Sequence, residues 1–155
     1  MDNKLNEWKE RLNEAQTGHY AASEKFSRIN NLLGLPLVIL SSFVSAFLFF
    51  DQNTYYLSVF LKVAGLLVAV LASIQTFIRP SEKSEQHRFK ATKYGGLKRK
   101  VEIFLIKHQE QESPKSQEFF DFCKEVVMEW NSIAEDSPVT PQHIRDKAKV
   151  ISDND

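Results

Sequence analysis

The stretch LLGLPLVILSSFVSAFLFF, from Leu32 to Phe50, decides the fold because its nineteen residues carry no formal charge. Thirteen of them are Leu, Ile, Val or Phe, which together favour insertion into a bilayer by about 4–8 kcal/mol. As an α-helix the stretch would rise about 28 Å, close to the roughly 30 Å of a hydrocarbon core. A buried helix of a water-soluble protein is the alternative, but such helices rarely stay apolar on every face for this length. We therefore predict a first membrane span over residues 32–50.

A second apolar run follows from Tyr55 to Ile78 and predicts a second span over residues 55–78. Its only charged residue is Lys62, about two helical turns from the start of the run. Its ammonium group can reach the membrane surface along the flexible side chain, or it can form a charged ring near the mouth of a pore. The polar residues 51–54 between the runs are few enough to allow only an antiparallel hairpin, so we predict an outer turn there.

Positive charges flank the two spans unevenly. The twenty residues after Ile78 hold six Lys or Arg, the twenty before Leu32 hold two, and the turn holds none. The positive-inside rule then places both termini in the cytoplasm and only the turn outside. About thirty mostly polar residues precede the first run, which argues against a signal peptide. A single cysteine, Cys123, excludes an intrachain disulfide and suits a reducing compartment.

The segments outside the spans predict long helical arms over residues 1–31 and 79–112. Ahead of the first span, apolar or small residues recur at alternating spacings of three and four, which is typical of a helix that packs along one seam. This seam consists of Leu5, Trp8, Leu12, Ala15, His19, Ala22, Phe26, Ile29 and Leu33. The second arm has a similar stripe, formed by His87, Ala91, Tyr94, Leu97, Val101, Phe104 and His108.

Glycine and proline mark the joints of these arms. Gly34 and Pro36 predict a hinge in the first helix, and Pro80 predicts one after the second span. Counting outward from the two prolines places His19 and His87 on facing seams, where we interpret them as a polar pair that sets the register. Two histidines are too few for a metal site. The pair Gly95-Gly96 indicates either a flexible joint or a place where close packing needs the missing side chains.

The rest of the chain predicts C-terminal helices over residues 115–150. One of them should bury a face made by Phe119, Phe122, Cys123, Val126, Trp130 and Ile133, and a short last helix should lie near residues 142–150. The predicted fold class is thus an all-α membrane protein in a single domain, residues 1–155. It has an antiparallel two-helix transmembrane hairpin, long cytoplasmic helical arms and a C-terminal helical segment that packs on the arms.

The spans contain residues that suit a pore, although two helices cannot enclose a channel and a pore would require a homo-oligomer. Candidates for lining or gating it are Ser41, Ser45, Phe43, Phe47, Lys62, Gln75 and Thr76. In such a pore the serines would form a polar strip and the phenylalanines an apolar constriction. Small residues that allow close helix packing are Ser42, Ala46, Gly65, Ala69 and Ser73. The alternative is that these residues only pack one hairpin against itself.

A basic cluster follows the second span and consists of Arg88, Lys90, Lys93, Lys98, Arg99 and Lys100. It can contact anionic lipid headgroups, each residue contributing about 1 kcal/mol near the surface, or it can bind a nucleotide phosphate. The chain has no glycine-rich phosphate loop, no nucleophile elbow and no Cys/His metal spacing. We therefore expect no enzyme activity, no metal, no cofactor and no direct nucleic-acid binding.

Several short motifs occur in a fixed order around the double span. They are Gly18 to Ala22 (Gly-His-Tyr-Ala-Ala), Asn31, Gly34-x-Pro36, Gln75-Thr76-Phe77, Glu85-x-His87, Tyr94 with Leu97, and Ser137-Pro138. In this order the chain resembles the SLATT family, two-transmembrane effectors associated with bacterial nucleotide-signalling conflict systems. The resemblance covers about residues 12–141.

The resemblance implies a function in antiviral defence. The subunits would oligomerise and permeabilise the inner membrane, so that an infected cell dies or stops growing (abortive infection). A nucleotide-dependent signal, from an enzyme or sensor encoded nearby, would trigger the pore. This chain has no recognisable nucleotide-binding domain that would receive that signal. The alternative is a membrane anchor or adaptor that forms no pore and docks a cytoplasmic partner through its helical arms.

Overall fold

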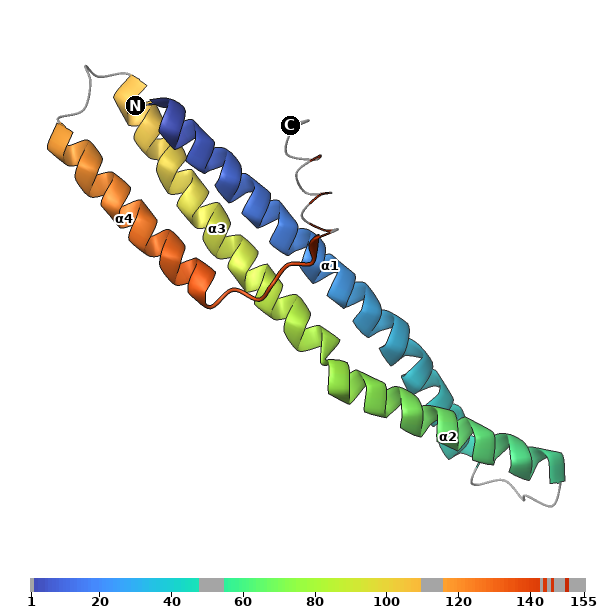
Figure 1. The fold of residues 1–155 in the computed structure, drawn as a ribbon. Coiled ribbons are helices and arrows are strands. Elements are labelled where there is room, and N and C mark those ends of the chain that lie inside the picture. Colours follow the sequence, from blue (N-terminus) through green and yellow to red (C-terminus); the bar gives the residue numbers. More distant parts are fainter. Residues whose placement is uncertain are drawn as a thin grey trace. The chain divides into compact units, whose positions relative to one another are not determined.

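The computed structural model describes residues 2–47, 55–109, 116–142, 144, 146 and 150. The regular elements in this part of the chain are the α-helices α1 (Asp2–Phe47), α2 (Tyr55–Ile78), α3 (Pro80–Gln109) and α4 (Ser116–Glu135), shown in Figure 1. The prediction of an all-α protein is therefore confirmed for the described residues. The expected outer turn at residues 51–54 and most of the expected last helix near residues 142–150 lie outside them.

The chain divides into two compact units. Unit 1 comprises Met1–Glu24 and Ser84–Asp155, and unit 2 comprises Lys25–Lys83. The divisions fall within α1 and near the start of α3. This division into compact units does not test the prediction of a single domain, which stays a prediction.

Unit 1 is built from the N-terminal part of α1 together with α3 and α4, which share one hydrophobic core (Figure 1). Its buried cluster consists of Leu5, Leu12, Tyr94, Leu97, Val101, Val126 and Ile133. Aromatic rings surround this cluster. The rings of Trp8 and Trp130 meet edge to face with centroids 6.5 Å apart, and those of Phe104 and Phe122 stack with centroids 3.8 Å apart. The core arises because every helix repeats apolar residues at three- and four-residue spacing and must cover that stripe.

Within unit 1, α1 and α3 run in opposite directions along their shared seam. Lys98 Nζ donates a hydrogen bond to Asn13 Oδ1 at 3.1 Å, and further along the seam the hydroxyls of Ser23 and Ser84 lie 3.2 Å apart. Helix α3 continues through Gly95 and Gly96 without a break. A Cβ atom added to Gly95 would lie 2.6 Å from Gln16 Nε2, whereas one added to Gly96 would meet nothing within 4 Å. Gly95 therefore marks close packing rather than a flexible joint.

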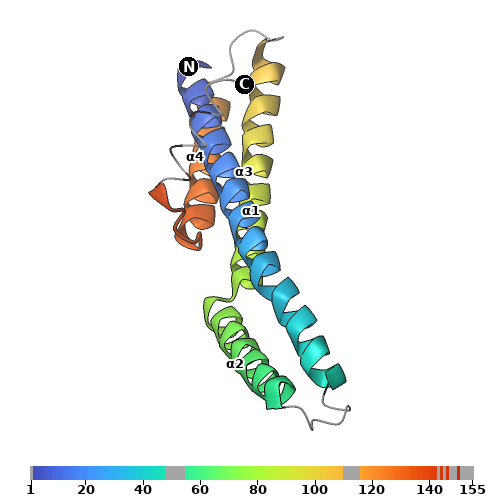
Figure 2. The same ribbon diagram turned by 90° about the vertical axis from the view of Figure 1, so that its right-hand side faces the viewer.

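Unit 2 holds the C-terminal part of α1 and all of α2, which Figure 2 shows beside one another. Both α1 and α2 contain stretches long and apolar enough to cross a membrane. In the most apolar stretch of α1 no residue is buried. In the most apolar stretch of the second candidate span, which lies within Tyr55–His108, 11% of the residues are buried. Leu61 and Ala64 are buried in α2, so the other apolar side chains of this helix are exposed or half-buried.

A single residue joins α2 to α3. Arg79 adopts a φ of 48°, in the left-handed region that often ends a helix. Its amide donates to the carbonyl of Gln75 at 3.0 Å, and its own carbonyl accepts from the amide of Lys83 at 3.1 Å. Pro80 then begins α3, where its missing N–H has no helical partner to lose. Because Pro80 disfavours the right-handed helical conformation at the residue before it, the break falls at Arg79.

Candidate functional site

Three serines of the predicted spans are hydrogen-bonded to their own helices. The hydroxyls of Ser41 and Ser42 donate to the carbonyl of Val38 at 3.0 and 2.8 Å, and that of Ser73 donates to the carbonyl of Ala69 at 2.7 Å. A hydroxyl satisfied in this way can face hydrocarbon at little cost. Ser45 and Phe43 are exposed, while Ser41 and Phe47 are half-buried. The rings of Phe43 and Phe47 stack with centroids 6.5 Å apart.

The small residues predicted for helix packing face away from the chain's own contacts. Ser42 and Ala46 of α1 and Ala69 and Ser73 of α2 are exposed, and a Cβ added to Gly65 would meet nothing within 4 Å. The two helices instead contact each other through other positions. The outward stripe on α2, formed by Gly65, Ala69 and Ser73, is therefore open to a neighbouring helix.

Gln75 lies at a contact between α1 and α2. Its Nε2 donates to Asn30 Oδ1 at 3.5 Å, and the same atom would lie 3.5 Å from a Cβ added to Gly34. Its Oε1 is buried without a hydrogen-bond partner among the described residues. An unsatisfied buried acceptor costs about 1–3 kcal/mol. The candidates Thr76 and Lys62, by contrast, are both exposed.

The three predicted hinge residues differ in their surroundings. Helix α1 continues through Pro36 without interruption. Gly34 sits at the Gln75 contact, where the neighbouring side chain lies at ordinary contact distance from its Cβ position. Pro80 is fully buried at the first position of α3. The only left-handed non-glycine residue in the described part of the chain is Arg79, which precedes Pro80.

His19 and His87 lie in direct contact at the α1–α3 seam of unit 1. Their Nδ1 atoms are 3.0 Å apart, and the two side chains are only 6% and 2% exposed. His19 also stacks on Tyr94, with ring centroids 5.4 Å apart. Burial lowers the pKa of His87 below its ordinary value of 6.5, because desolvation disfavours the charged form. One imidazole must donate and the other accept, so the pair suits two neutral rings better than two charged ones.

A cavity of about 370 Å³ opens beside His19, also within unit 1. Its polar lining includes Arg11, Glu14, His19 and Thr140, and the hydroxyls of Tyr94 and Ser137 meet there at 3.5 Å. Its apolar walls come from Ala15, Ala134, Pro138 and Val139. The volume lies at the lower end of the range for small-molecule pockets. The sequence patterns singled out His19 and Ser137-Pro138, but nothing in them indicated that these residues would line one cavity.

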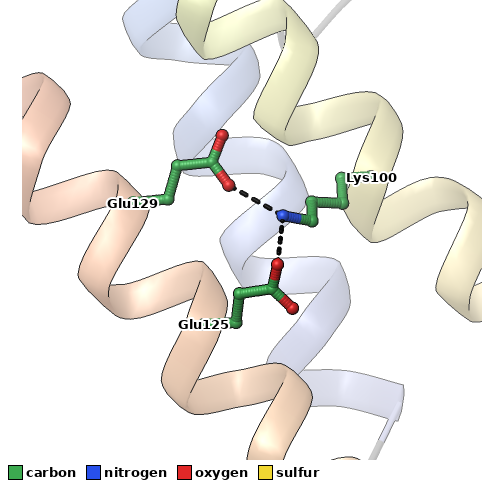
Figure 3. Close-up of polar contacts among 3 residues, drawn as sticks. All are labelled: Lys100, Glu125 and Glu129. Atoms are coloured by element: carbon green, nitrogen blue, oxygen red, sulfur yellow. Dashed lines mark hydrogen bonds and ion pairs between the residues drawn. The ribbon is translucent and has the colours of Figure 1, made fainter.

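The basic cluster does not form one continuous surface. Lys100 Nζ bridges Glu125 and Glu129 of α4 at 2.7 and 2.9 Å (Figure 3), and these carboxylates raise the pKa of Lys100. Lys90 is buried and donates to the carbonyl of Ile133 at 3.3 Å, and Lys98 binds Asn13. The remaining members, Arg88, Lys93 and Arg99, are exposed. Half of the predicted anion or lipid contacts are therefore engaged in the packing of unit 1.

Comparison with protein-family models, with curated proteins and with solved structures gives no match. The resemblance to the SLATT family therefore rests on the order of the sequence motifs alone. Among the residues that the structure describes, no group of three His, Cys, Asp or Glu side chains could hold a metal ion.

Proposed function

We propose that the protein is a two-transmembrane effector whose subunits assemble in the bacterial inner membrane and permeabilise it. The observation that carries this proposal is the exposed apolar surface of unit 2. Its large exposed side chains are Leu32, Leu35, Val38, Ile39, Phe43, Tyr55, Tyr56, Val59, Phe60, Val63, Leu66, Leu67, Val70, Ile74 and Phe77. A soluble monomer rarely exposes so many large apolar groups together, because water penalises each of them.

In this proposal α2 and the C-terminal part of α1 form an antiparallel hairpin across the bilayer. The short connection over residues 51–54 supports the antiparallel arrangement. The six Lys and Arg among the twenty residues after Ile78, with none in the connection, support cytoplasmic termini. Tyr55 and Tyr56, which are 76% and 81% exposed, suit the outer membrane–water boundary.

Permeabilisation requires several copies, because two helices enclose no channel. Support comes from the outward stripe of Gly65, Ala69 and Ser73, which the chain itself leaves uncovered. Small residues of this kind let helices of neighbouring subunits approach closely in lipid. The resemblance to the SLATT family adds the expected context of antiviral defence, with a nucleotide-dependent signal from a separate enzyme or sensor.

The test measures membrane integrity in a bacterial host that overproduces the protein. We expect loss of membrane potential and uptake of a DNA-binding dye, and we expect Gly65→Leu with Ala69→Leu to reduce both at least tenfold by blocking close packing. The matched control, Val63→Leu with Val70→Leu, changes exposed residues on another side of α2 and should retain activity.

Growth arrest with a normal membrane potential would contradict the pore. A membrane anchor or adaptor would then be favoured, for which the packed core of unit 1 is the supporting observation. For an adaptor, the stripe variants should stay active, whereas Leu12→Asp in the core of unit 1 should abolish activity.

A further inference from the structure

The outward face of α3 combines large apolar side chains with positive charge. Phe89, Ile103 and Ile106 are 58%, 67% and 59% exposed, although α3 is not part of the apolar spans. Arg88 and Arg99 are exposed on the same side of the helix. Phe89 and Ile103 are fourteen residues apart, four helical turns, with Gly96 midway, so they line up along one face. Neither arginine forms an ion pair with another residue that the structure describes.

The outward face of α4 has the complementary character. Phe120, Val127 and Met128 are 63%, 40% and 57% exposed, and the carboxylates of Asp121 and Glu135 are exposed near them. Phe120 and Val127 are seven residues apart on α4, the same spacing as Phe89 and Gly96 on α3. Outside the α3–α4 contact, the exposed charges beside these apolar residues are Arg88, Lys93 and Arg99 against Glu85 on α3, and Asp121 and Glu135 against Lys124 on α4. The α3 face is therefore net positive and the α4 face net negative.

One chain does not bring these two faces together. The α3–α4 contact within unit 1 uses Lys100 with Glu125 and Glu129, and Lys107 with Glu118. The apolar residues of both outward faces remain exposed beside this contact between α3 and α4, two helices that Figure 1 shows next to each other. A second copy of the chain is therefore the partner that matches both the charge and the apolar spacing.

We infer that the outward face of α3 docks on the outward face of α4 of a second copy of this chain. The contact joins two different surfaces, so each subunit offers one free face for the next, and such head-to-tail contacts form a ring when the rotation between subunits closes. This inference rests on the proposed function and adds to it the cytoplasmic surface that orders the subunits. An anionic lipid surface would match the α3 face, with the arginines at the headgroups and the apolar side chains at the acyl boundary, but it would leave the acidic α4 face without a partner.

The test is a cross-link between two populations of single-cysteine chains. Both carry Cys123→Ala. One population carries Gly96→Cys, where an added Cβ meets nothing within 4 Å. The other carries Val127→Cys, which replaces an exposed side chain of α4. The two chains bear different tags, are produced in the same cells and are oxidised in isolated membranes. We expect a disulfide-linked dimer that carries both tags.

Each population alone should give at least tenfold less dimer, because position 96 does not meet position 96 in a head-to-tail contact. The matched control pairs Gly96→Cys with Asn6→Cys, an exposed position on α1, and should give a similarly low yield. Charge is tested by Arg99→Glu in the Gly96→Cys chains, which should lower the mixed dimer at least fivefold. Asp121→Arg in the Val127→Cys chains should restore it.

The inference is overturned if the mixed dimer is no more abundant than in the controls, or if either population links to itself. Mass measurement of the detergent-extracted protein separates this result from failure of the proposed function. An oligomer without the 96–127 cross-link overturns the interface alone, whereas a monomer overturns both proposals. A third result would assign the α3 face to lipid: the extracted protein retains phosphatidylglycerol, the Arg99→Glu variant loses it, and the 96–127 cross-link does not form.

Discussion

At the scale of single residues, the imidazole of His87 links the stability of unit 1 to pH. His87 is 2% exposed and lies 3.0 Å from His19 between their Nδ1 atoms, at a seam where Tyr94 covers His19. Its pKa in the folded chain lies below 6.5 because burial penalises the charged ring. As the pH falls below 6.5, the unfolded chain takes up a proton that the folded chain resists. The free energy of unfolding must therefore decrease with acidification.

This linkage predicts that the melting temperature falls between pH 7.5 and pH 5.5, and that His87→Gln makes the fall smaller. Circular dichroism of the detergent-solubilised protein at half-unit steps measures the slope. The control is His108→Gln, which changes the other described histidine of α3 at a place away from the His19–His87 pair. His108 lies near the end of α3, and its Nδ1 is 2.8 Å from the carbonyl oxygen of Phe104 in the same helix. Equal slopes for the unsubstituted protein and His87→Gln would contradict the linkage.

At the scale of the helix, the two adjacent glycines of α3 behave differently although the sequence presents them as one pair. Glycine inside a helix costs about 1 kcal/mol relative to alanine, because it loses more backbone freedom on folding. A Cβ at Gly96 meets nothing within 4 Å, whereas a Cβ at Gly95 would lie 2.6 Å from Gln16 Nε2 and force that side chain to move. The cost of moving Gln16 opposes the gain in helix propensity at position 95 only.

We predict that Gly96→Ala raises the free energy of unfolding by about 0.5–1 kcal/mol. Gly95→Ala should raise it by less, or lower it. Denaturant unfolding of both variants in the same detergent measures the difference. Adding Gln16→Ala, and comparing Gly95→Ala with that single variant, removes the clash and should recover the gain. If Gly95→Ala stabilises as much as Gly96→Ala without this second change, the α1–α3 seam is looser than described.

The break between α2 and α3 also belongs to the scale of the helix. The proline at position 80 predicted a joint, and the structure places it one residue earlier, where Arg79 ends one helix and its carbonyl accepts the first bond of the next. At Pro36 the same residue type leaves α1 continuous. Pro36 removes one hydrogen bond inside α1 without ending that helix, whereas Pro80 stands at the first position of α3, where no helical hydrogen bond is lost.

At the scale of the whole molecule, the apolar surface of unit 2 leads to a prediction about location and orientation. We expect the protein to stay in the membrane pellet after alkaline carbonate extraction and to need detergent for release. In a Cys123→Ala background, an impermeant maleimide added to spheroplasts should label Asn53→Cys and spare Asn3→Cys. Disruption of the membrane should expose Asn3→Cys equally and serves as the control.

A carbonate-soluble protein, or labelling of Asn3→Cys in sealed spheroplasts, would contradict this orientation. The prediction rests on the distribution of Lys and Arg around the spans, which is a property of the sequence. The structure adds that many large apolar side chains of unit 2 are exposed within one chain, which supports the prediction.

The sequence alone determined the elements whose signal is local. Nineteen uncharged residues predict a long apolar helix whatever surrounds them. The seven-residue spacing of Leu5, Leu12 and His19 predicts a buried face because seven residues make almost two turns of a helix. Counting outward from Pro36 and Pro80 placed His19 and His87 on facing seams, and the structure has the two in contact.

Only the tertiary structure decided which polar groups find partners. Lys100 bridges Glu125 and Glu129 because α4 docks beside α3, and Arg11 and Ser137 line one cavity although 126 positions separate them in the chain. Such contacts depend on how separate helices pack, and helical periodicity within each segment carries no information about that choice. For the same reason, the six residues of the basic cluster look equivalent in sequence and have different surroundings in the fold.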